Sequence, residues 1–180
     1  MVTERDIDIF RSLERTPLTP EQLLRLSETF PEPFPTLDRV QRRLRQLADA
    51  GQVRSWRYAT TEQGSGPLYY KLTIDAYRIL HGHDATLPTK RFLQELPIAR
   101  HHHTRSLADF LVHTLIAAHR LGIQIIDFHP ENTLRIAVGD HALFPDASFS
   151  LLLPNGFQFT YHVGLYNSTE PISLPRDRIK

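Results

Sequence analysis

The sequence TLDRVQRRLRQLADAGQVRSWRYA, residues 36–59, contains a helix, a helix stop and the start of a strand. Thr36 is a suitable N-cap for this helix, and Gly51 suits the position after its end, where a left-handed backbone is common. One stripe of the helix is apolar at helical spacing, and it consists of Val40, Leu44 and Leu47. We therefore expect that stripe to pack into a core and the opposite side to face solvent.

The solvent-facing side of this helix is basic. Arginines fill it and continue into the following strand, whereas the same stretch holds only two acids, Asp38 and Asp49. Guanidinium groups bind phosphate with paired hydrogen bonds and can also read guanine edges. We therefore predict that double-stranded DNA is bound by Arg39, Arg42, Arg43, Arg45, Gln46, Arg54 and Arg57. Because any exposed amphipathic helix carries a charged face, docking to a protein is the alternative role.

The elements around this helix complete a known arrangement. Two helices precede it, one capped by Thr3 and one capped by Thr19 with Pro20 in its first position. The runs QVRSWRYA and PLYYKLT follow as two β-type segments joined by TTEQGSG, and TIDAYRILHG forms a further helix. Three helices and then a two-stranded ribbon is the order of a winged helix-turn-helix, whose third helix can enter the major groove. Residues 1–83 are predicted to form this DNA-binding domain.

The second half of the chain mixes one helix with several strands. Residues 84–98 carry two prolines and no sustained periodicity, which indicates a linker. SLADFLVHTLIAAHRLG is then predicted to be a helix that Ser106 caps and Gly122 ends, and IQIIDF to be a strand. The segments ALFPDASFSLLL and FQFTYHVGLY flank PNG, which is a hairpin signal. Pro145 marks a strand start, an edge or a bulge.

Several segments of the chain carry a resemblance to a known family. They are RDIDIFRSLERTPLTPEQLLRLS, RVQRRLRQLADAGQVRSWR and PLYYKLTIDAYRIL in the first half, and HHHTRSLADFLVHTLIAA, DFHPENTLRI, LFPDASFSLLL and FQFTYHVGLYNSTEPI in the second. Together they resemble the replication-relaxation family, which comprises winged-helix proteins of plasmids and other mobile elements. The resemblance implies a small restriction-endonuclease-like α/β domain for residues 99–180. The expected fold class is therefore α+β.

The resemblance also identifies a degraded nuclease site. A nuclease of this type holds a divalent metal between carboxylates, so that a bound water becomes hydroxide. Asp146 stands where the first-strand carboxylate belongs, and Glu131 is expected on a helix beside it. Family members carry Glu-x-Asp on the second strand, but here Gly164 and Tyr166 occupy those positions, and Glu170 lies beyond the turn.

We therefore predict a vestigial acidic site at Glu131 and Asp146, with no catalytic residue, no metal and no cofactor. Asp146 could equally be a turn residue that bonds its own backbone. A metal-dependent DNA nuclease that uses Asp146 and Glu131 with unconventional ligands is the alternative.

Ten histidines offer further candidate ligands. His113 and His119 lie six apart on the predicted helix and do not share a face, so they do not match a helical zinc site. A mixed site with Asp146 would take its imidazoles from His129, His141 and His162. In the run of three histidines before the helix, His102 or His103 is expected to pack at the helix start.

Composition limits the remaining possibilities. The 180 residues include no cysteine, which excludes disulfides, thiolate metal sites and cysteine nucleophiles. The net charge is +1, so the distribution of charge is more informative than its total. No apolar run approaches the roughly 18 residues of a membrane span, and MVTERDIDIF lacks the apolar region of a signal peptide. We expect a cytoplasmic protein without membrane contact.

These observations predict a DNA-binding regulator or accessory factor, acting in transcription or in mobile-element replication or transfer. Winged helices commonly bind paired half-sites with two-fold symmetry, so a homodimer is expected. The nuclease-like domain would then serve dimerisation or contact with a protein partner.

Overall fold

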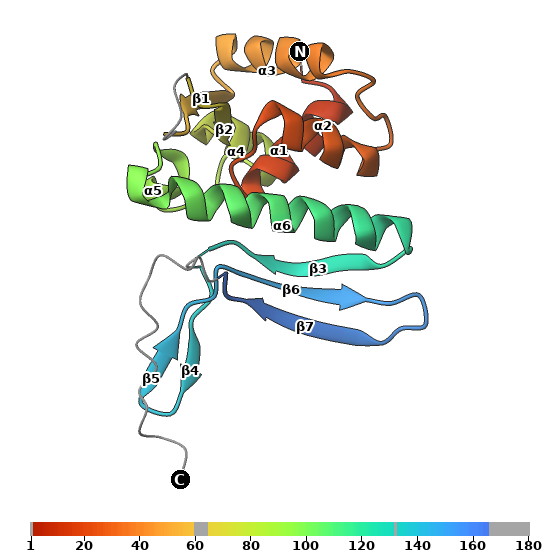
Figure 1. Ribbon diagram of the computed structural model, residues 1–180, viewed down its shortest axis with the longest axis vertical. Coiled ribbons are helices and arrows are strands. Elements are labelled where there is room, and N and C mark those ends of the chain that lie inside the picture. The colour runs from red at the N-terminus through yellow and green to blue at the C-terminus, as the bar shows by residue number, and fades with distance from the viewer. Residues whose placement is uncertain (1, 60–64, 132, 166–180) are drawn as a thin grey trace.

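The computed structural model describes residues 2–59, 65–131 and 133–165, and it has the predicted α+β class (Figure 1). Helices dominate one half of the molecule and antiparallel strands the other. The long helix α6 lies between the other helices and the three-stranded sheet. None of the helices in the described ranges combines the length and apolar character that a membrane span requires.

The first half contains three helices, a hairpin and a fourth helix. Its elements are α1 (Glu4–Arg15), α2 (Pro20–Leu26), the 3-10 turn η1 (Ser27–Thr29), α3 (Leu37–Asp49), β1 (Val53–Arg57), β2 (Leu68–Leu72) and α4 (Ile74–His81). Thr3 and Thr19 cap α1 and α2 through capping boxes, as predicted. Thr36 occupies the N-cap of α3 but makes no side-chain hydrogen bond there. Leu18 pairs with Tyr70, so the α1–α2 connection extends the β1–β2 sheet by one bridge.

The second half begins with short helical turns and continues into α6 and the strands. Its elements are α5 (Lys90–Leu93), η2 (Ile98–Arg100), α6 (His101–Arg120), β3 (Gln124–His129), β4 (Ile136–Val138), β5 (His141–Leu143), β6 (Ala147–Leu152) and β7 (Gln158–Val163). Gly122 follows α6 with φ of 66°, which confirms the predicted helix stop. The hairpin around PNG is confirmed as β6–β7, whereas the β4–β5 hairpin was not predicted.

The predicted cap at Ser106 is wrong, because α6 begins five residues earlier, at His101. The buried His101 ring accepts a hydrogen bond from the Ala59 amide (2.7 Å) and donates one to the Leu96 carbonyl (3.1 Å). Its neighbour His102 is exposed. Contacts with the end of β1 and with the segment before η2 therefore position the helix start.

Residues 84–98, the predicted linker, are tied to the first half. Lys71 on β2 donates through Nζ to the carbonyls of Arg91 (3.0 Å) and Gln94 (2.6 Å). The Tyr69 hydroxyl accepts a hydrogen bond from the Leu96 amide at 3.0 Å. The segment also forms α5, so it is ordered against β2 rather than extended away from it.

Helix α6 contributes to two apolar cores. One side of it joins the helices of the first half through Ala108, Val112, Leu115 and Ile116. The other side packs on the β3–β6–β7 sheet through Leu107 and Leu111, which contact Ala147 and Phe149. The first core thus crosses the predicted boundary between residues 1–83 and 99–180, and the division into domains stays a prediction.

The three-stranded sheet has β6 at its centre and one face toward α6. Phe149 lies on that face, paired with Tyr161 of β7. The other face carries polar pairs, in which Ser148 bonds His162 (2.9 Å) and Ser150 bonds Thr160 (2.8 Å). Ser148 and Ser150 are themselves buried, so their hydroxyls are paired across the strands rather than with solvent.

An ion pair between the buried Asp6 and the half-buried Arg43 connects α1 to α3. Asp6 is fully buried, and its carboxylate accepts two hydrogen bonds from the Arg43 guanidinium (2.7 and 2.5 Å) and two from Thr3. Burial opposes ionisation of Asp6, but the hydrogen bonds from Arg43 and Thr3 outweigh it and hold the pKa of Asp6 below its ordinary value. The pair therefore fixes the position of α3 on the first half.

Replacing Arg43 by Ala should lower the free energy of unfolding at pH 7 by about 2–3 kcal/mol, because Asp6 stays buried without its partner. Since the folded pKa of Asp6 lies below the unfolded one, its stabilisation is present above about pH 4. That contribution is lost as the pH falls through the folded pKa, so the difference between wild type and variant should narrow at acidic pH. Urea unfolding at pH 7 and pH 3 measures both effects, with Arg43→Lys as the charge-retaining control. Equal stabilities at pH 7 would contradict the assignment.

Candidate functional site

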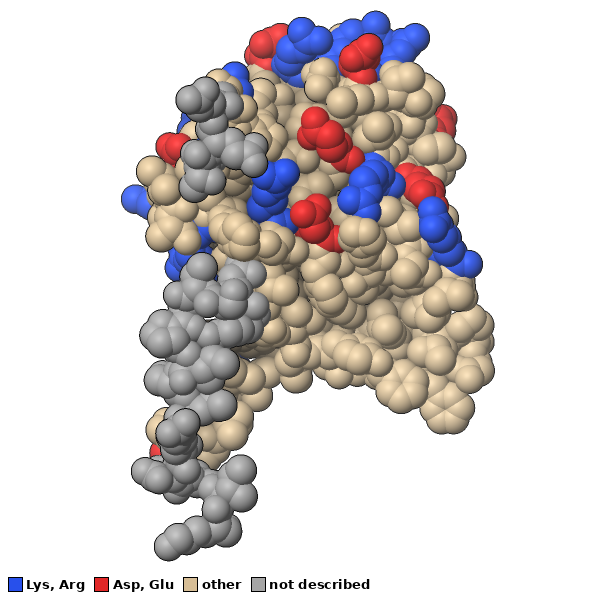
Figure 2. All heavy atoms as spheres, viewed as in Figure 1, with Lys and Arg blue, Asp and Glu red and all other residues tan. Residues whose placement is uncertain are grey.

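The predicted DNA-binding residues are mostly exposed. On α3 the exposed members are Arg39, Arg42, Arg45 and Gln46, and on β1 they are Arg54 and Arg57. The apolar stripe of α3 is buried as predicted, with Val40 and Leu44 at 0% exposure. Figure 2 shows Lys and Arg side chains gathered at the end of the molecule that α3 forms, with a few acidic groups among them. This end lies farthest from the three-stranded sheet.

Arg43 differs from the other arginines of α3 because it points inward. Its guanidinium bonds Asp6 and also donates to Gln46 at 3.0 Å. Because the Arg43 guanidinium bonds Asp6, it holds α3 in place. Contact of Arg43 with DNA stays a prediction. Its buried partner, Asp6, lies 37 residues earlier in the chain, so the helical period of α3 gives no signal for this contact.

The two arginines of β1 project from opposite faces of the hairpin, because they are three positions apart and side chains alternate along a strand. Arg57 and Arg45 line the same hollow, about 440 Å³ in volume, between α2, α3 and the hairpin. The Arg57 guanidinium also donates to the Gly66 carbonyl at 3.2 Å. Arg54 pairs across the hairpin with Lys71, on the other face. Arg57 is therefore the β1 arginine that continues the α3 surface.

The second candidate site is a cluster of three titratable side chains. Asp146 and Glu131, predicted as a pair, are joined by His103, and each residue offers one ligand atom within 4.8 Å of the others. His103 lies in the first turn of α6, and Asp146 immediately precedes β6. Glu131 lies in a turn after β3, so its predicted position on a helix is wrong. Pro130, which lacks an amide hydrogen, follows the last residue of β3.

The side chains of this cluster already form hydrogen bonds and an ion pair within the protein. His103 Nε2 bonds Asp146 Oδ1 at 2.9 Å, and Asp146 Oδ2 accepts a hydrogen bond from the Leu165 amide at 2.7 Å. The Asp146 amide donates to the Val163 carbonyl at 2.8 Å. Glu131 forms an ion pair with Arg100. Asp146 therefore ties the start of β6 to the end of β7 and to α6.

One imidazole and two carboxylates could also hold a divalent metal such as Zn²⁺ or Mn²⁺. To bind such a metal, the Glu131 carboxylate would have to leave Arg100 and coordinate the ion, and two or three waters would complete the coordination. Gly164 directly follows β7 and brings no ligand atom from a side chain. Tyr166 and Glu170 lie outside the described residues.

The histidine of this cluster is not among those predicted to approach Asp146. In the described ranges, the only group of three or more potential ligands is the one with His103, so His129, His141 and His162 join no such group. A signal for His103 was present in the sequence, since His103, Leu107 and Leu111 are spaced by four. Extending the predicted helix to residue 101 would have placed all three on the side that faces the sheet.

Comparisons of the chain with protein-family models, curated proteins and solved structures found no match. The resemblance to the replication-relaxation family therefore stays a prediction.

We expect the cluster to act as a structural tie. Replacing Asp146 by Ala should lower the free energy of unfolding by about 1–3 kcal/mol, because His103 and the Leu165 amide lose their acceptor. Thermal unfolding measures the change, with Asp140→Ala in the exposed β4–β5 turn as control. Removal of divalent metals by EDTA should leave the wild-type melting temperature unchanged. A rise in melting temperature with Mn²⁺ or Zn²⁺ that disappears in Asp146→Ala would instead identify a metal site.

Proposed function

We propose that the chain is a DNA-binding regulator or accessory factor that binds duplex DNA through a winged helix-turn-helix. The observation that carries this proposal is the row of exposed arginines on α3 beside Arg57 of the hairpin. In a winged helix the third helix enters the major groove and the wing rests on the backbone. The order α1, α2, α3, β1, β2 and the bridge between Leu18 and Tyr70 support that comparison.

The remaining half would then be a non-catalytic scaffold related to nucleases. This proposal is supported by the hydrogen bonds of Asp146, whose two carboxylate oxygens bond His103 and the Leu165 amide. The resemblance described above would place the DNA contact in mobile-element replication, transfer or transcription.

Replacing both Arg42 and Arg45 by Ala should weaken binding to duplex DNA. Each lost phosphate contact reduces the magnitude of the negative slope of log affinity against log salt by roughly 0.9, so the slope should become less steep by about 2. Fluorescence anisotropy with a random-sequence duplex across a salt series measures both quantities. The matched control is Arg120→Ala with Arg135→Ala, which removes the same charge from α6 and from the segment before β4. Equal affinity of the Arg42/Arg45 variant and wild type would refute the assignment of α3.

The cluster of His103, Glu131 and Asp146 favours one other function, a metal-dependent nuclease. The same binding reactions, run with Mg²⁺ or Mn²⁺ on plasmid DNA, reveal cleavage as nicked or linear product. Cleavage that Asp146→Ala abolishes would support the nuclease. Binding without cleavage would support the regulator. Absence of DNA binding at low salt would support a winged helix that docks on a protein.

We also propose a homodimer formed along β7. Within the described ranges β7 pairs only with β6, so its other edge is open. The strand carries no Lys, Arg, Asp or Glu, although charged residues commonly protect sheet edges. Phe159 and Tyr161 are 49% and 48% exposed, and around β6 and β7 the face in Figure 2 lacks charged groups. Antiparallel pairing of β7 with its copy would cover these rings and give two-fold symmetry.

Replacing Phe159 and Tyr161 by Lys should convert the dimer to a monomer, since like charges would meet across the two-fold axis. Size-exclusion chromatography with light scattering measures the mass. The control, Leu121→Lys with Val138→Lys, adds the same charge at exposed apolar positions of α6's C-terminal end and β4. A wild-type protein that is monomeric at every concentration tested would rule out the β7 interface.

A further inference from the structure

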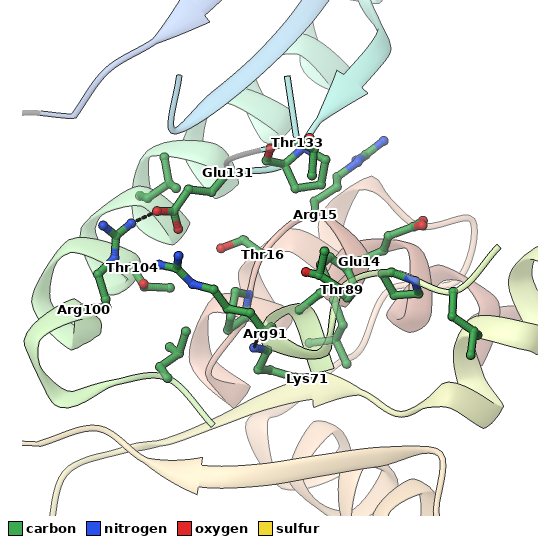
Figure 3. Close-up of a pocket in the computed structure, with 18 residues that line it drawn as sticks. Glu14, Arg15, Thr16, Lys71, Thr89, Arg91, Arg100, Thr104, Glu131 and Thr133 are labelled. Atoms are coloured by element: carbon green, nitrogen blue, oxygen red, sulfur yellow. Dashed lines mark hydrogen bonds and ion pairs between the residues drawn. The ribbon is translucent and has the colours of Figure 1, made fainter. Parts of the chain in front are cut away.

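A cavity of about 470 Å³ lies where the first half meets α6 and the turn after β3 (Figure 3). Its walls come from the end of α1, strand β2, the segment from Leu87 to Arg100, the first turns of α6 and the turn around Glu131. The volume is within the range of sites that hold small organic ligands. The DNA surface on α3 and the dimer edge on β7 do not use this cavity.

Basic side chains outnumber acidic ones around the cavity. Four of the lining residues are basic, namely Arg15, Lys71, Arg91 and Arg100, against the two acids Glu14 and Glu131. Glu131 pairs with Arg100, which reduces the charge of that wall. The Arg15 guanidinium stacks on the Phe128 ring, 5.5 Å from its centroid. Among the described residues, Lys71 and the exposed Arg91 are therefore the lining cations with neither an acidic partner nor a ring contact.

Lys71 is a buried cation in the wall of this cavity. Its side chain is buried, and Nζ donates to two backbone carbonyls of the segment that follows α4. Burial lowers the pKa of Lys71 to about 8, and the charge of Arg91 adds to the shift. Two like charges along one cavity repel each other, and an anion between them would relieve this repulsion.

Thr104 offers an unused hydrogen-bond donor at the same place. It is 3% exposed, and its hydroxyl has no hydrogen-bond partner within the part of the chain that the structure describes. Buried hydroxyls are nearly always paired, so an unpaired one beside a cavity is a candidate contact for a bound polar group. In Figure 3 the Arg91 side chain extends toward the start of α6, where Thr104 lies.

The rest of the lining is largely apolar. Leu13, Phe92, Leu96 and Leu107 contribute side chains, and Pro17 and Pro88 add ring surface. An inorganic ion would leave this surface without contacts. A ligand that combines one oxyanion group with an apolar body would use both parts of the cavity.

We propose that this cavity binds a small organic oxyanion, a carboxylate or a phosphate monoester attached to an apolar group. Arg91 and Lys71 hold the charge, Thr104 donates a hydrogen bond, and the leucines and prolines cover the apolar body. Because Lys71 belongs to β2 and Thr104 to α6, the ligand fastens the hairpin to the helix that both cores share. Bound ligand would then favour one placement of the hairpin relative to α6. This consequence for DNA binding rests on the proposed function, whereas the ligand site does not.

The direct test is calorimetric titration of the full chain with phenyl phosphate and with benzoate, each at constant ionic strength. Benzamide, a neutral analogue of benzoate, is the ligand control. We expect binding of at least one anion, a dissociation constant about tenfold or more larger in Arg91→Ala, and none for benzamide. The tighter of the two anions identifies the oxyanion class.

Three further variants, compared with Arg91→Ala, locate the site. Thr104→Val keeps the side-chain shape and should weaken binding without loss of stability, because the hydroxyl has no partner to lose. Lys90→Ala, an exposed neighbour of Arg91 outside the cavity lining, should bind as wild type does. The pair Arg42→Ala and Arg45→Ala should also bind normally, which excludes the α3 surface as the site. The proposal is overturned if neither anion binds at millimolar concentration, if benzamide binds equally, or if Arg91→Ala leaves the affinity unchanged.

A separate anisotropy titration with duplex DNA, in the presence and absence of the bound anion, tests the regulatory consequence. A shift in DNA affinity in wild type but not in Arg91→Ala supports an effector role. Anion binding by a chain without DNA affinity would refute the proposed function and retain the ligand site. DNA binding that the anion leaves unchanged would retain both and remove the coupling between them.

Discussion

The two apolar sides of α6 are the constraint on which the rest of the structure depends. Ala108 and Val112 pack among the helices of the first half, and Leu107 and Leu111 pack on the sheet. A helix with apolar residues on both sides cannot expose either side without cost, so both halves must dock on it. Hydrogen bonds hold α2 against α6, because Gln22 bonds Asp109 and Arg25 bonds His113. The first turn of α6 thereby brings His103 and Thr104 to the junction of the two halves.

Local signals in the sequence predicted most of the elements, because their causes lie within a few residues. The caps at Thr3 and Thr19 satisfy amides one turn away, and Gly51 takes a left-handed backbone with φ of 72°. The start of α6 could not be predicted in the same way. It depends on the His101 ring, which contacts Ala59, 42 residues earlier, and sequence periodicity carries no information on such a contact.

In the candidate sites, too, the sequence predicted what depends on local periodicity but not what depends on contacts with distant residues. The exposure of Arg42 and Arg45 follows from their position opposite Val40 on α3, which the helical period determines. Arg43 has the same chemistry, but the buried carboxylate of Asp6 redirects it into the structure. The pairing of Glu131 with Asp146 followed from the family resemblance, whereas the third member, His103, required the correct start of α6. Long-range partners therefore decide which members of a charged run remain available for a ligand.

Glu131 connects the acidic cluster with the oxyanion cavity, because it is a member of one and lines the other. Its ion pair with Arg100 draws the carboxylate toward a cation at the start of α6. A metal in the cluster would compete for that carboxylate, and the released guanidinium would be a further unpaired cation in the cavity beside Lys71 and Arg91. Metal binding would thus strengthen the attraction of the cavity for an oxyanion, and an oxyanion held by Arg100 would in turn release Glu131 for the metal. If both a metal and an oxyanion bound, they would therefore favour each other's binding, and the residue they share, Glu131, lies next to the start of α6.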